Sequence, residues 1–453
     1  MSGMTETQKT VAVVAVVAVV IIAGVGVYFL AGNNNNYSAE KLDSKLLICG
    51  NANEDLVLDA DDTAIIQDII DRKENMTLEN YPMADANNDG KVTNADLTLV
   101  NDLIAGNKTT VYIQCLDYDG NSTVVAADYP LRNVVPFGTN IVEPFLYVGG
   151  GQYVAGYFTS SYDNLEYSMS AAIDLGGSAR KISDSAWQNF NNLDATCGGV
   201  GALLIDISGV SQFTDSYRSG LADAQIPVII YAPADQMQEI GVALTLGFLC
   251  GKTTEALGLS YAKLSLEVYK AIQGKVSAVS DDDKASVINF TMGIYVCQND
   301  STFNQSSSYI GAVPYYKINS DFATVYAGSN SVKMQSVEAL ADYDNASCLV
   351  SNRSLDVGQT DTAAAWVEMW DKYVTYFQDL DDYHGLVYIN NLLPGACKLA
   401  YLAAAAYPEL FSDDWANGVM QDFIDGGFTS LEGQTLDTIP TSFDYDDYIA
   451  ANA

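Results

Sequence analysis

The chain has 453 residues, a length that allows two or three folded domains. Its 57 acidic and 21 basic side chains give a formal net charge of −36, which argues against binding to nucleic acid and against attachment to anionic lipid through basic patches. Hydrophobic residues make up 49%, enough for a large core, and the single histidine, His384, excludes sites built from several histidines.

An uncharged apolar run lies near the N-terminus, over residues 10–32. As a helix that rises about 1.5 Å per residue, it is long enough to span a hydrocarbon core of about 30 Å. A cleavable signal peptide usually has a shorter apolar region, of about 7–15 residues. We therefore expect a single-pass anchor in the cell membrane with the bulk of the chain outside the cell. Cleavage near Ala31 and Gly32 is the alternative.

Two acidic loops repeat along the chain with a shift of 34 residues. In both, oxygen-bearing side chains stand at loop positions 1, 3, 5 and 12, and position 7 is expected to offer its backbone carbonyl. The expected ligands are Asp85, Asn87, Asp89, Lys91, Thr93 and Asp96 in the second loop, and Asn51, Asn53, Asp55, Val57 and Asp62 in the first. Ca²⁺ takes about six to eight hard oxygen ligands, and a loop of this length wraps them around one ion. We expect the first site to be weaker, because Leu56 stands where the second loop has Gly90.

This pair of loops, with an apolar helix pattern after each, resembles a type I dockerin over residues 45–107. The resemblance implies a small all-α, EF-hand-like domain that binds Ca²⁺. Dockerins bind cohesin modules through their helices, so the resemblance also implies a cohesin-type protein partner. The alternative is a spacer that calcium holds together and that binds no protein.

From residue 110 onward the pattern becomes that of a mixed α/β protein. Strand-like runs at 111–115, 122–126, 133–137, 202–206, 227–231, 286–290 and 348–351 alternate with helical patterns near 143–147, 237–272, 362–378 and 396–406. Asp119–Gly120 separates the first two runs and predicts a hairpin.

The order of these elements resembles the solute-binding proteins of ABC importers for iron–siderophore, haem and cobalamin. The resemblance is carried by residues 127–143, 150–156, 226–231, 336–340 and 407–411, and best by IGVALTLGFLCGKTTEA at 240–256. It implies an α/β fold of two Rossmann-like lobes, 110–235 and 274–440, joined by one long helix over 236–273. It also implies capture of a metal chelate between the lobes and delivery to an ABC permease, without catalysis.

In this family one glutamate on each lobe contacts arginines of the permease. Glu338 fits that role on the second lobe. The corresponding glutamate of the first lobe is missing from the stretch around 185–193, and Asp184 is the candidate that replaces it.

The walls of a ligand pocket are expected on loops that follow core strands. The candidates are Phe137, Thr139, Asn140, Tyr157, Tyr231, Tyr295, Arg353, Trp366 and His384. Aromatic rings offer flat apolar area with a polar edge, which suits a corrin, a porphyrin or a catecholate chelate. Arg353 can pair with a carboxylate or phosphate of the ligand.

Two other functions remain open at this point. The chain can be a cell-surface scaffold or adhesion protein that acts through dockerin–cohesin docking, in which case the α/β region has no transport role. It can also be an enzyme on the same two-lobed fold, because a fold does not determine a function.

Overall fold

The computed structural model describes residues 44–158, 172–177, 182–233, 236–291, 295–297, 301–325, 331–333, 346–355, 358, 360–373, 386–428 and 431–452. The apolar segment at 10–32, Glu338 and His384 lie outside these ranges. None of the helices within them combines the length and the apolar character that crossing a bilayer requires. The membrane anchor stays a prediction.

Two loop–helix units follow one another at the start of the described chain, over residues 44–107, and we call them the loop–helix pair. Their helices are α2 (Ala60–Ile70) and α3 (Asn94–Ala105), with a short 3₁₀ turn, η2 (Pro82–Ala84), between them. Each α-helix starts with a capping box, Asp59 with Asp62 in α2 and Thr93 with Asp96 in α3, which satisfies backbone N–H groups that the first helical turn leaves unpaired. The last residue of each acidic loop therefore also helps to cap a helix.

The first lobe is built on a five-stranded sheet in the order β2-β1-β7-β6-β3. Its strands are β1 (Thr109–Leu116), β2 (Ser122–Tyr129), β3 (Val134–Phe137), β6 (Ala202–Asp206) and β7 (Val228–Tyr231). β1 and β2 form the predicted hairpin, paired from Thr109 with Tyr129 to Leu116 with Ser122. β3, β6 and β7 are parallel, and β3 and β6 are buried along their whole length, as expected for strands covered on both faces.

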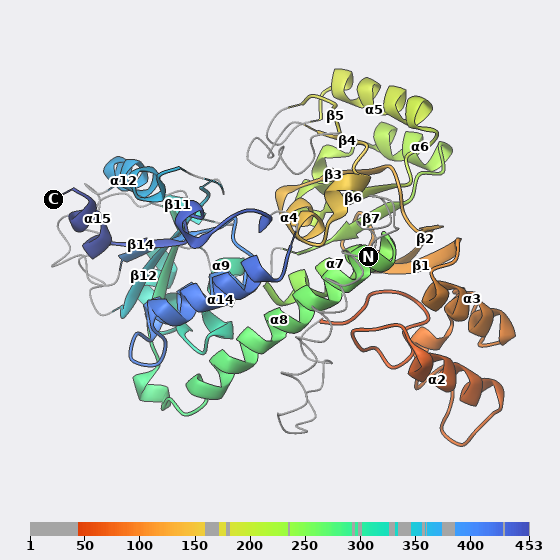
Figure 1. Ribbon diagram of the computed structural model, residues 1–453, viewed down its shortest axis with the longest axis horizontal. Helices are drawn as coiled ribbons and strands as arrows, with labels where there is room; N and C mark the ends of the chain where they lie inside the picture. Colours follow the sequence, from red (N-terminus) through yellow and green to blue (C-terminus); the bar gives the residue numbers. More distant parts are fainter. Residues whose placement is uncertain are drawn as a thin grey trace, which may run out of the picture. The chain divides into compact units, whose positions relative to one another are not determined.

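Helices cover both faces of this sheet (Figure 1). On one face, α4 (Thr139–Tyr147) and α7 (Gln236–Leu249) share a hydrophobic cluster with alternate residues of the central strands. On the other, α5 (Asp184–Cys197) and α6 (Asp215–Asp223) pack against the remaining strand residues. The short strands β4 (Gly156–Tyr157) and β5 (Ile173–Asp174) form a small separate sheet.

The loop–helix pair is joined directly to the first lobe. Ile48 forms a bridge with Ile113 of β1, the Cys49 N–H donates to the Tyr112 carbonyl at 2.8 Å, and the Gln114 N–H donates to the Leu47 carbonyl at 3.0 Å. Buried side chains of α2 and α3 belong to the same hydrophobic cluster as those of β1 and α7. The pair and the lobe therefore share one core.

The predicted single helix over 236–273 is wrong in one respect, because the chain turns back on itself at Cys250 and Gly251. Gly251 has a φ of 105°, a conformation that side-chain-bearing residues rarely adopt, and it ends the first helical run. The result is an antiparallel pair, α7 followed by α8 (Lys252–Val276). α8 links the lobes: on one side Leu259, Ala262 and Leu266 join the core of the first lobe, and on another side Tyr261, Val268 and Ile272 join that of the second.

The close approach of α7 and α8 depends on glycines, which yields a first prediction. A Cβ at Gly247 would lie 2.6 Å from the backbone oxygen of Thr254, too close for either helix to keep its place. We expect Gly247→Ala to lower the free energy of unfolding by about 2 kcal/mol, measured by urea titration. Gly274→Ala on α8 is the control, since nothing lies within 4 Å of its Cβ and alanine favours the helix. Equal stability of the two variants would contradict the tight packing.

The second lobe is built on a mixed sheet in the order β11-β9-β8-β12-β13-β14, with β10 paired to β8. The pairings among β10, β8, β12 and β13 are parallel, and those of β9, β11 and β14 are antiparallel. Its strands are β8 (Ser286–Thr291), β9 (Tyr295–Cys297), β10 (Val313–Pro314), β11 (Ser331–Lys333), β12 (Cys348–Arg353), β13 (Leu386–Asn390) and β14 (Ser442–Asp444). Its α-helices are α9 (Thr302–Tyr309), α10 (Ser320–Val325), α12 (Thr362–Tyr373), α13 (Gly395–Ala406), α14 (Asp413–Asp425) and α15 (Tyr445–Ala451). The 3₁₀ turns of the two lobes are η3 (Gly150–Tyr153), η5 (Ile207–Gln212), η6 (Asp281–Asp283), η7 (Tyr315–Lys317) and η11 (Leu436–Thr438).

The second lobe extends beyond the predicted end at residue 440. β14 pairs with β13, with Phe443 opposite Tyr388, and the Tyr448 ring of α15 stacks on Trp370 of α12 at 5.3 Å. These contacts bury Phe443 and hold the last helix against the lobe, so the chain as far as Ala451 is part of it.

Candidate functional site

Strands of the two sheets end at a common seam between the lobes. β3 and β6 of the first lobe lead directly into α4 and η5, and β13 of the second lobe leads into α13. The Tyr147 hydroxyl at the end of α4 donates to the Leu392 carbonyl, just after β13, at 2.7 Å. Ligands of α/β proteins typically bind where the carboxyl ends of parallel strands meet. This seam is therefore the first place to look for a binding site.

Four ionisable side chains meet at the seam, and we call them the interlobe cluster: Glu143, Asp206, Glu239 and Lys398. They come from α4, from the end of β6, from α7 and from α13, so both lobes contribute. All three carboxyl residues are at most 6% exposed. Charges buried to this degree are costly unless they are paired, and they commonly mark functional sites.

Glu239 is the centre of the cluster. Its carboxylate accepts hydrogen bonds from the Gly395 N–H at 3.0 Å and from the Tyr261 hydroxyl, and the Lys398 Nζ lies 4.0 Å away. A Cβ at Gly395 would lie 2.8 Å from the Glu239 Oε2, so glycine is what lets α13 begin this close to α7. Glu239 thus ties the second lobe to the helical hairpin of the first.

Asp206 is held in place from within the first lobe. Its carboxylate accepts from the Asn140 side chain at 2.6 Å and from the Ser208 N–H at 2.9 Å. Burial raises the pKa of Asp206 above its usual range, and these hydrogen bonds oppose that shift.

Burial raises the pKa of Glu143 to about 8, and this carboxyl group faces Lys398, Glu239 and Asp206. Lys398 lowers the pKa, whereas Glu239 and Asp206 raise it. Even with Glu143 protonated, two carboxylates stand against one ammonium group, so the seam favours positive charge. A ligand that carries a cation, a metal centre or hydrogen-bond donors fits it better than an anion does.

The structure brings one predicted ligand residue, Asn140, to the interlobe cluster, and places two others in hydrophobic cores. Phe137 meets Phe158 and Phe213 edge to face at 5.6 and 5.2 Å, and Trp366 stacks on Phe443 at 6.2 Å. Both are at most 4% exposed. Both side chains pack in hydrophobic cores, as large aromatic side chains commonly do, and their assignment to a pocket wall stays a prediction.

The remaining candidates are spread over both lobes. Tyr157 forms β4 and is buried against the core of the first lobe, while Thr139 is the first residue of α4. Tyr295 packs at the margin of the aromatic core of the second lobe, and the guanidinium of Arg353 lies 2.8 Å from the Met369 sulfur. Tyr231 lines a cavity of the first lobe, which is described below.

Sequence reasoning missed most of the interlobe cluster, although two signals were present. Asp206 directly follows a buried strand, and Glu239 is the only charged residue in the apolar run 236–249. Lys398 gives no such signal, because nothing local distinguishes it from a surface lysine.

The candidate permease contact of the first lobe, Asp184, lies on the surface. It is the first residue of α5 and accepts from the Tyr217 hydroxyl at 2.9 Å. Its counterpart on the second lobe, Glu338, lies outside the described residues.

The two acidic loops of the loop–helix pair have the same internal geometry. In each loop, the side chain at position 12 accepts hydrogen bonds from the backbone N–H groups of positions 3 and 9. The side chain at position 3 accepts from the N–H of position 5, and the side chain at position 5 accepts from the N–H of position 7. These eight hydrogen bonds are between 2.8 and 3.2 Å long. The repeat seen in the sequence is therefore a repeat in structure.

Position 1 distinguishes the two loops. The Asp85 carboxylate accepts from the N–H groups of Asp89 and Gly90, at 3.0 and 2.7 Å, and Gly90 has the positive φ of 86° that a sharp turn needs. In the first loop the Asn51 amide donates instead to two backbone carbonyls, and its Oδ1 is buried without a partner.

The donor set fits calcium, most clearly in the second loop. Carboxylates, an amide and backbone carbonyls are the hard oxygen ligands that Ca²⁺ prefers, and the buried Asn51 Oδ1 is an oxygen in need of a donor or a cation. Across the described ranges, no group of three or more His, Cys, Asp or Glu residues is arranged for a metal ion.

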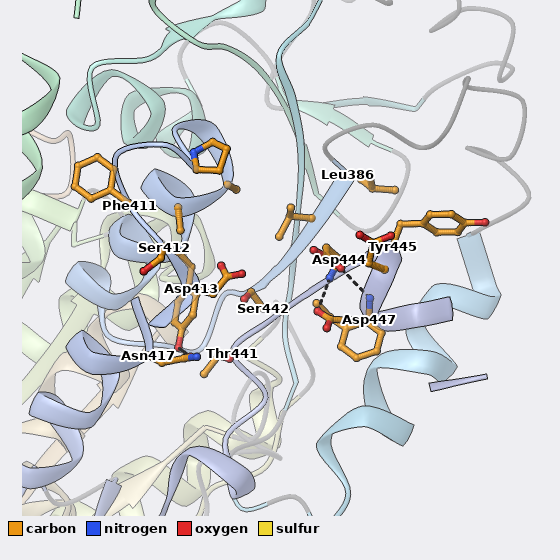
Figure 2. A pocket seen from close by; sticks show the side chains of 17 residues that line it. Leu386, Phe411, Ser412, Asp413, Asn417, Thr441, Ser442, Asp444, Tyr445 and Asp447 are labelled. Carbon is orange, nitrogen blue, oxygen red and sulfur yellow. Dashed lines mark hydrogen bonds between the residues drawn. The ribbon is translucent and has the colours of Figure 1, made fainter. Parts of the chain in front are cut away.

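A cavity of ≈ 730 Å³ opens in the second lobe between α13, α14, β14 and α15. Figure 2 shows its acidic wall, formed by Asp413, Asp444 and Asp447. Asp444 caps the N-terminus of α15, where it and Asp447 accept from each other's backbone N–H groups at 2.8 and 3.1 Å, and Asp413 lies in the first turn of α14. Acidic residues at helix N-termini stabilise the helices, and this accounts for the three aspartates in the wall of this cavity.

The structure is similar to that of the TroA-like periplasmic binding protein FepB of Veillonella parvula, with a TM-score of 0.55, 15% identity, and coverage of 73% of this chain and 99% of that chain. The chain has the fold of a TroA-like periplasmic binding protein. Other similar structures are the molybdate-binding protein MolA of Haemophilus influenzae (TM-score 0.48, 11% identity, 70% and 97% coverage) and CeuE of Helicobacter pylori with Ni(II) bound (TM-score 0.48, 10% identity, 70% and 96% coverage). No family model matches the chain, and no curated protein matches its sequence.

Proposed function

We propose that this protein is the extracellular substrate-binding protein of an ABC importer, and that it captures a metal chelate between its two lobes. The observation that carries the proposal is the interlobe cluster, which gathers buried charges from both lobes at the seam of a fold shared with a periplasmic binding protein. A ligand at the seam would contact both lobes at once and so favour the closed pairing.

The joint between the lobes suits a small movement. α8 contributes to both cores, and the Glu239–Gly395 contact links the helical hairpin to the second lobe. A packed helical joint permits limited hinge or shear motion. The ligand classes that the sequence resemblance implies are iron–siderophore, haem and cobalamin, and a negatively charged seam favours those that present a cationic or donor-rich face.

In this proposal the segment 10–32 anchors the protein in the cell membrane and a permease binds the outer surfaces of the lobes. Asp184 is the proposed contact on the first lobe and Glu338 on the second. The protein has no catalytic role, since the two lobes bind and release the chelate unchanged.

Thermal unfolding of the full chain with candidate ligands tests the proposal. Haem, cobalamin and ferric siderophores are added one at a time, and a true ligand at 100 times its Kd stabilises the folded protein by about 2.7 kcal/mol. Glu239→Gln keeps acceptors for the Gly395 N–H and the Tyr261 hydroxyl but removes the charge, so we expect it to weaken binding about tenfold.

The matched control is Asp223→Asn, at an exposed carboxylate of α6. Transport is contradicted if no member of the three ligand classes stabilises the protein. A site at the seam is contradicted if a ligand binds and both variants bind it as the wild type does.

A second proposal concerns the loop–helix pair, which we infer binds Ca²⁺ in both loops and more tightly in the second. The repeated hydrogen bonds of the loops and the unpartnered Asn51 Oδ1 support it. A cohesin-type partner would make the protein a surface scaffold. Calcium-dependent capture of a purified cohesin module, lost on adding EGTA, is the result that would favour the scaffold over the transporter.

A further inference from the structure

A cavity of ≈ 490 Å³ lies where the first lobe meets the loop–helix pair. Its walls come from three parts of the chain: Leu47 and Met83 of the loop–helix pair, Leu116 and Val124 of the β1–β2 hairpin, and Val242 of α7. Cavities of about 300–1,000 Å³ with mainly apolar walls are typical of small-molecule sites.

One side chain in the wall has a polar group without a partner. Tyr231, at the end of β7, is 4% exposed, and its hydroxyl has no hydrogen bond in the protein. Burial, and then the neighbouring Cys115, raises the pKa of Tyr231 well above its usual value, so the phenol is neutral. A buried hydroxyl without a partner costs about 1–3 kcal/mol, and a ligand that supplies the partner recovers that cost.

The wall offers no unpaired charge. Lys45 is the only charged residue that lines the cavity, and it forms an ion pair with Glu54. A charged ligand would lose its hydration without gaining a counter-ion, which is unfavourable in an apolar cavity. The occupant that fits is therefore uncharged.

We propose that this cavity is a second binding site, for an uncharged and mainly apolar small molecule whose one polar group hydrogen-bonds to the Tyr231 hydroxyl. Such a molecule contacts the loop–helix pair and the first lobe together, and so strengthens the junction between them. None of the residues that line it belongs to the interlobe cluster, and the proposal does not depend on transport.

The test uses the full chain and N-phenyl-1-naphthylamine, a neutral apolar dye whose fluorescence rises in apolar surroundings and whose single N–H can donate to the tyrosine oxygen. We expect saturable binding by the wild type. Tyr231→Phe removes only the hydroxyl, so we expect about two- to tenfold weaker binding with no loss of thermal stability. Val124→Trp fills the cavity from the edge strand β2 and should weaken binding more than tenfold.

Ala126→Trp is the matched control, because Ala126 lies two residues further along β2, is exposed and does not line the cavity. It should bind the dye as the wild type does. The proposal is overturned if the wild type shows no saturable binding, or if Val124→Trp and Ala126→Trp bind equally, since the dye then lies elsewhere. A dye displaced by a chelate but unaffected by Val124→Trp would assign the binding to the seam.

Discussion

Removing calcium should destabilise the first lobe together with the loop–helix pair, in a single transition. The reason is the shared core, in which side chains of α2 and α3 pack in one cluster with those of β1 and α7. The Cys49–Tyr112 and Gln114–Leu47 hydrogen bonds join the edge of β1 to the residues immediately before the first loop. At 1 mM free Ca²⁺ and a Kd of about 1–10 µM, each site contributes about 3–4 kcal/mol.

Asp85→Asn is the variant that tests this prediction most directly. Asparagine already occupies the equivalent first position of the other loop, so the fold tolerates it there, while the substitution removes one carboxylate that we propose binds Ca²⁺. We expect the metal-free variant to be about as stable as the metal-free wild type, and to lose at least half of the stabilisation by Ca²⁺. Asp128→Asn, an exposed carboxylate on β2, should leave that stabilisation unchanged.

Calorimetry with Ca²⁺ or EGTA, and hydrogen exchange at the amides of Cys49 and Gln114, measure these effects. Both amides should exchange faster in EGTA because they join the two parts. A separate low-temperature transition confined to 44–107, with unchanged exchange at Gln114, would show that the pair folds independently of the lobe.

The sequence alone was sufficient to predict those structural elements that are determined by residues close together in the chain. The Asp119–Gly120 turn predicts the β1–β2 hairpin, and the apolar runs at 202–206 and 227–231 predict buried strands that the structure confirms. The repeated loops predict two similar units, and their hydrogen bonds are the same. In each case the signal and the structure lie within a dozen residues of each other.

The break between α7 and α8 shows where local reasoning fails. The run at 237–272 is helical in pattern and lacks proline, and glycine alone does not end a helix. The turn at Gly251 is stable because Gly247 and Gly258 let the two helices pack closely, which depends on the whole hairpin. Tertiary packing, rather than local propensity, decides the point.

The interlobe cluster could not be assembled from sequence for a similar reason. Glu143 and Lys398 are separated by 255 positions (398 − 143) and meet because α4 and α13 face the same seam. Trp366 shows the converse: an aromatic residue is chemically suited to a ligand, yet this one, on α12, packs in the core. A residue's position in the fold, and not its type, decides whether it lies in a candidate binding site or in the core.

The protein should lose stability as the pH rises from about 5 to 8, and Glu143→Gln should remove most of that loss. Burial raises the pKa of Glu143 from 4.5 to about 8 in the folded state, so the folded protein holds a proton there that the unfolded chain releases. The stabilisation by this proton is complete below about pH 4.5 and disappears as the pH passes 8. A single group changes the free energy of unfolding by at most about 1.4 kcal/mol per pH unit.

Urea titrations at pH 5, 6, 7 and 8 measure this effect for the wild type, Glu143→Gln and the control Asp223→Asn. We expect the stability of Glu143→Gln relative to the wild type to rise by about 2–4 kcal/mol over that range. The charged groups that face Glu143 are Lys398, Glu239 and Asp206, and all three remain in the variant, so the difference isolates one carboxyl group. Parallel pH profiles for the wild type and Glu143→Gln would mean that this carboxyl is already ionised at neutral pH, and that the seam is more negative than its burial implies.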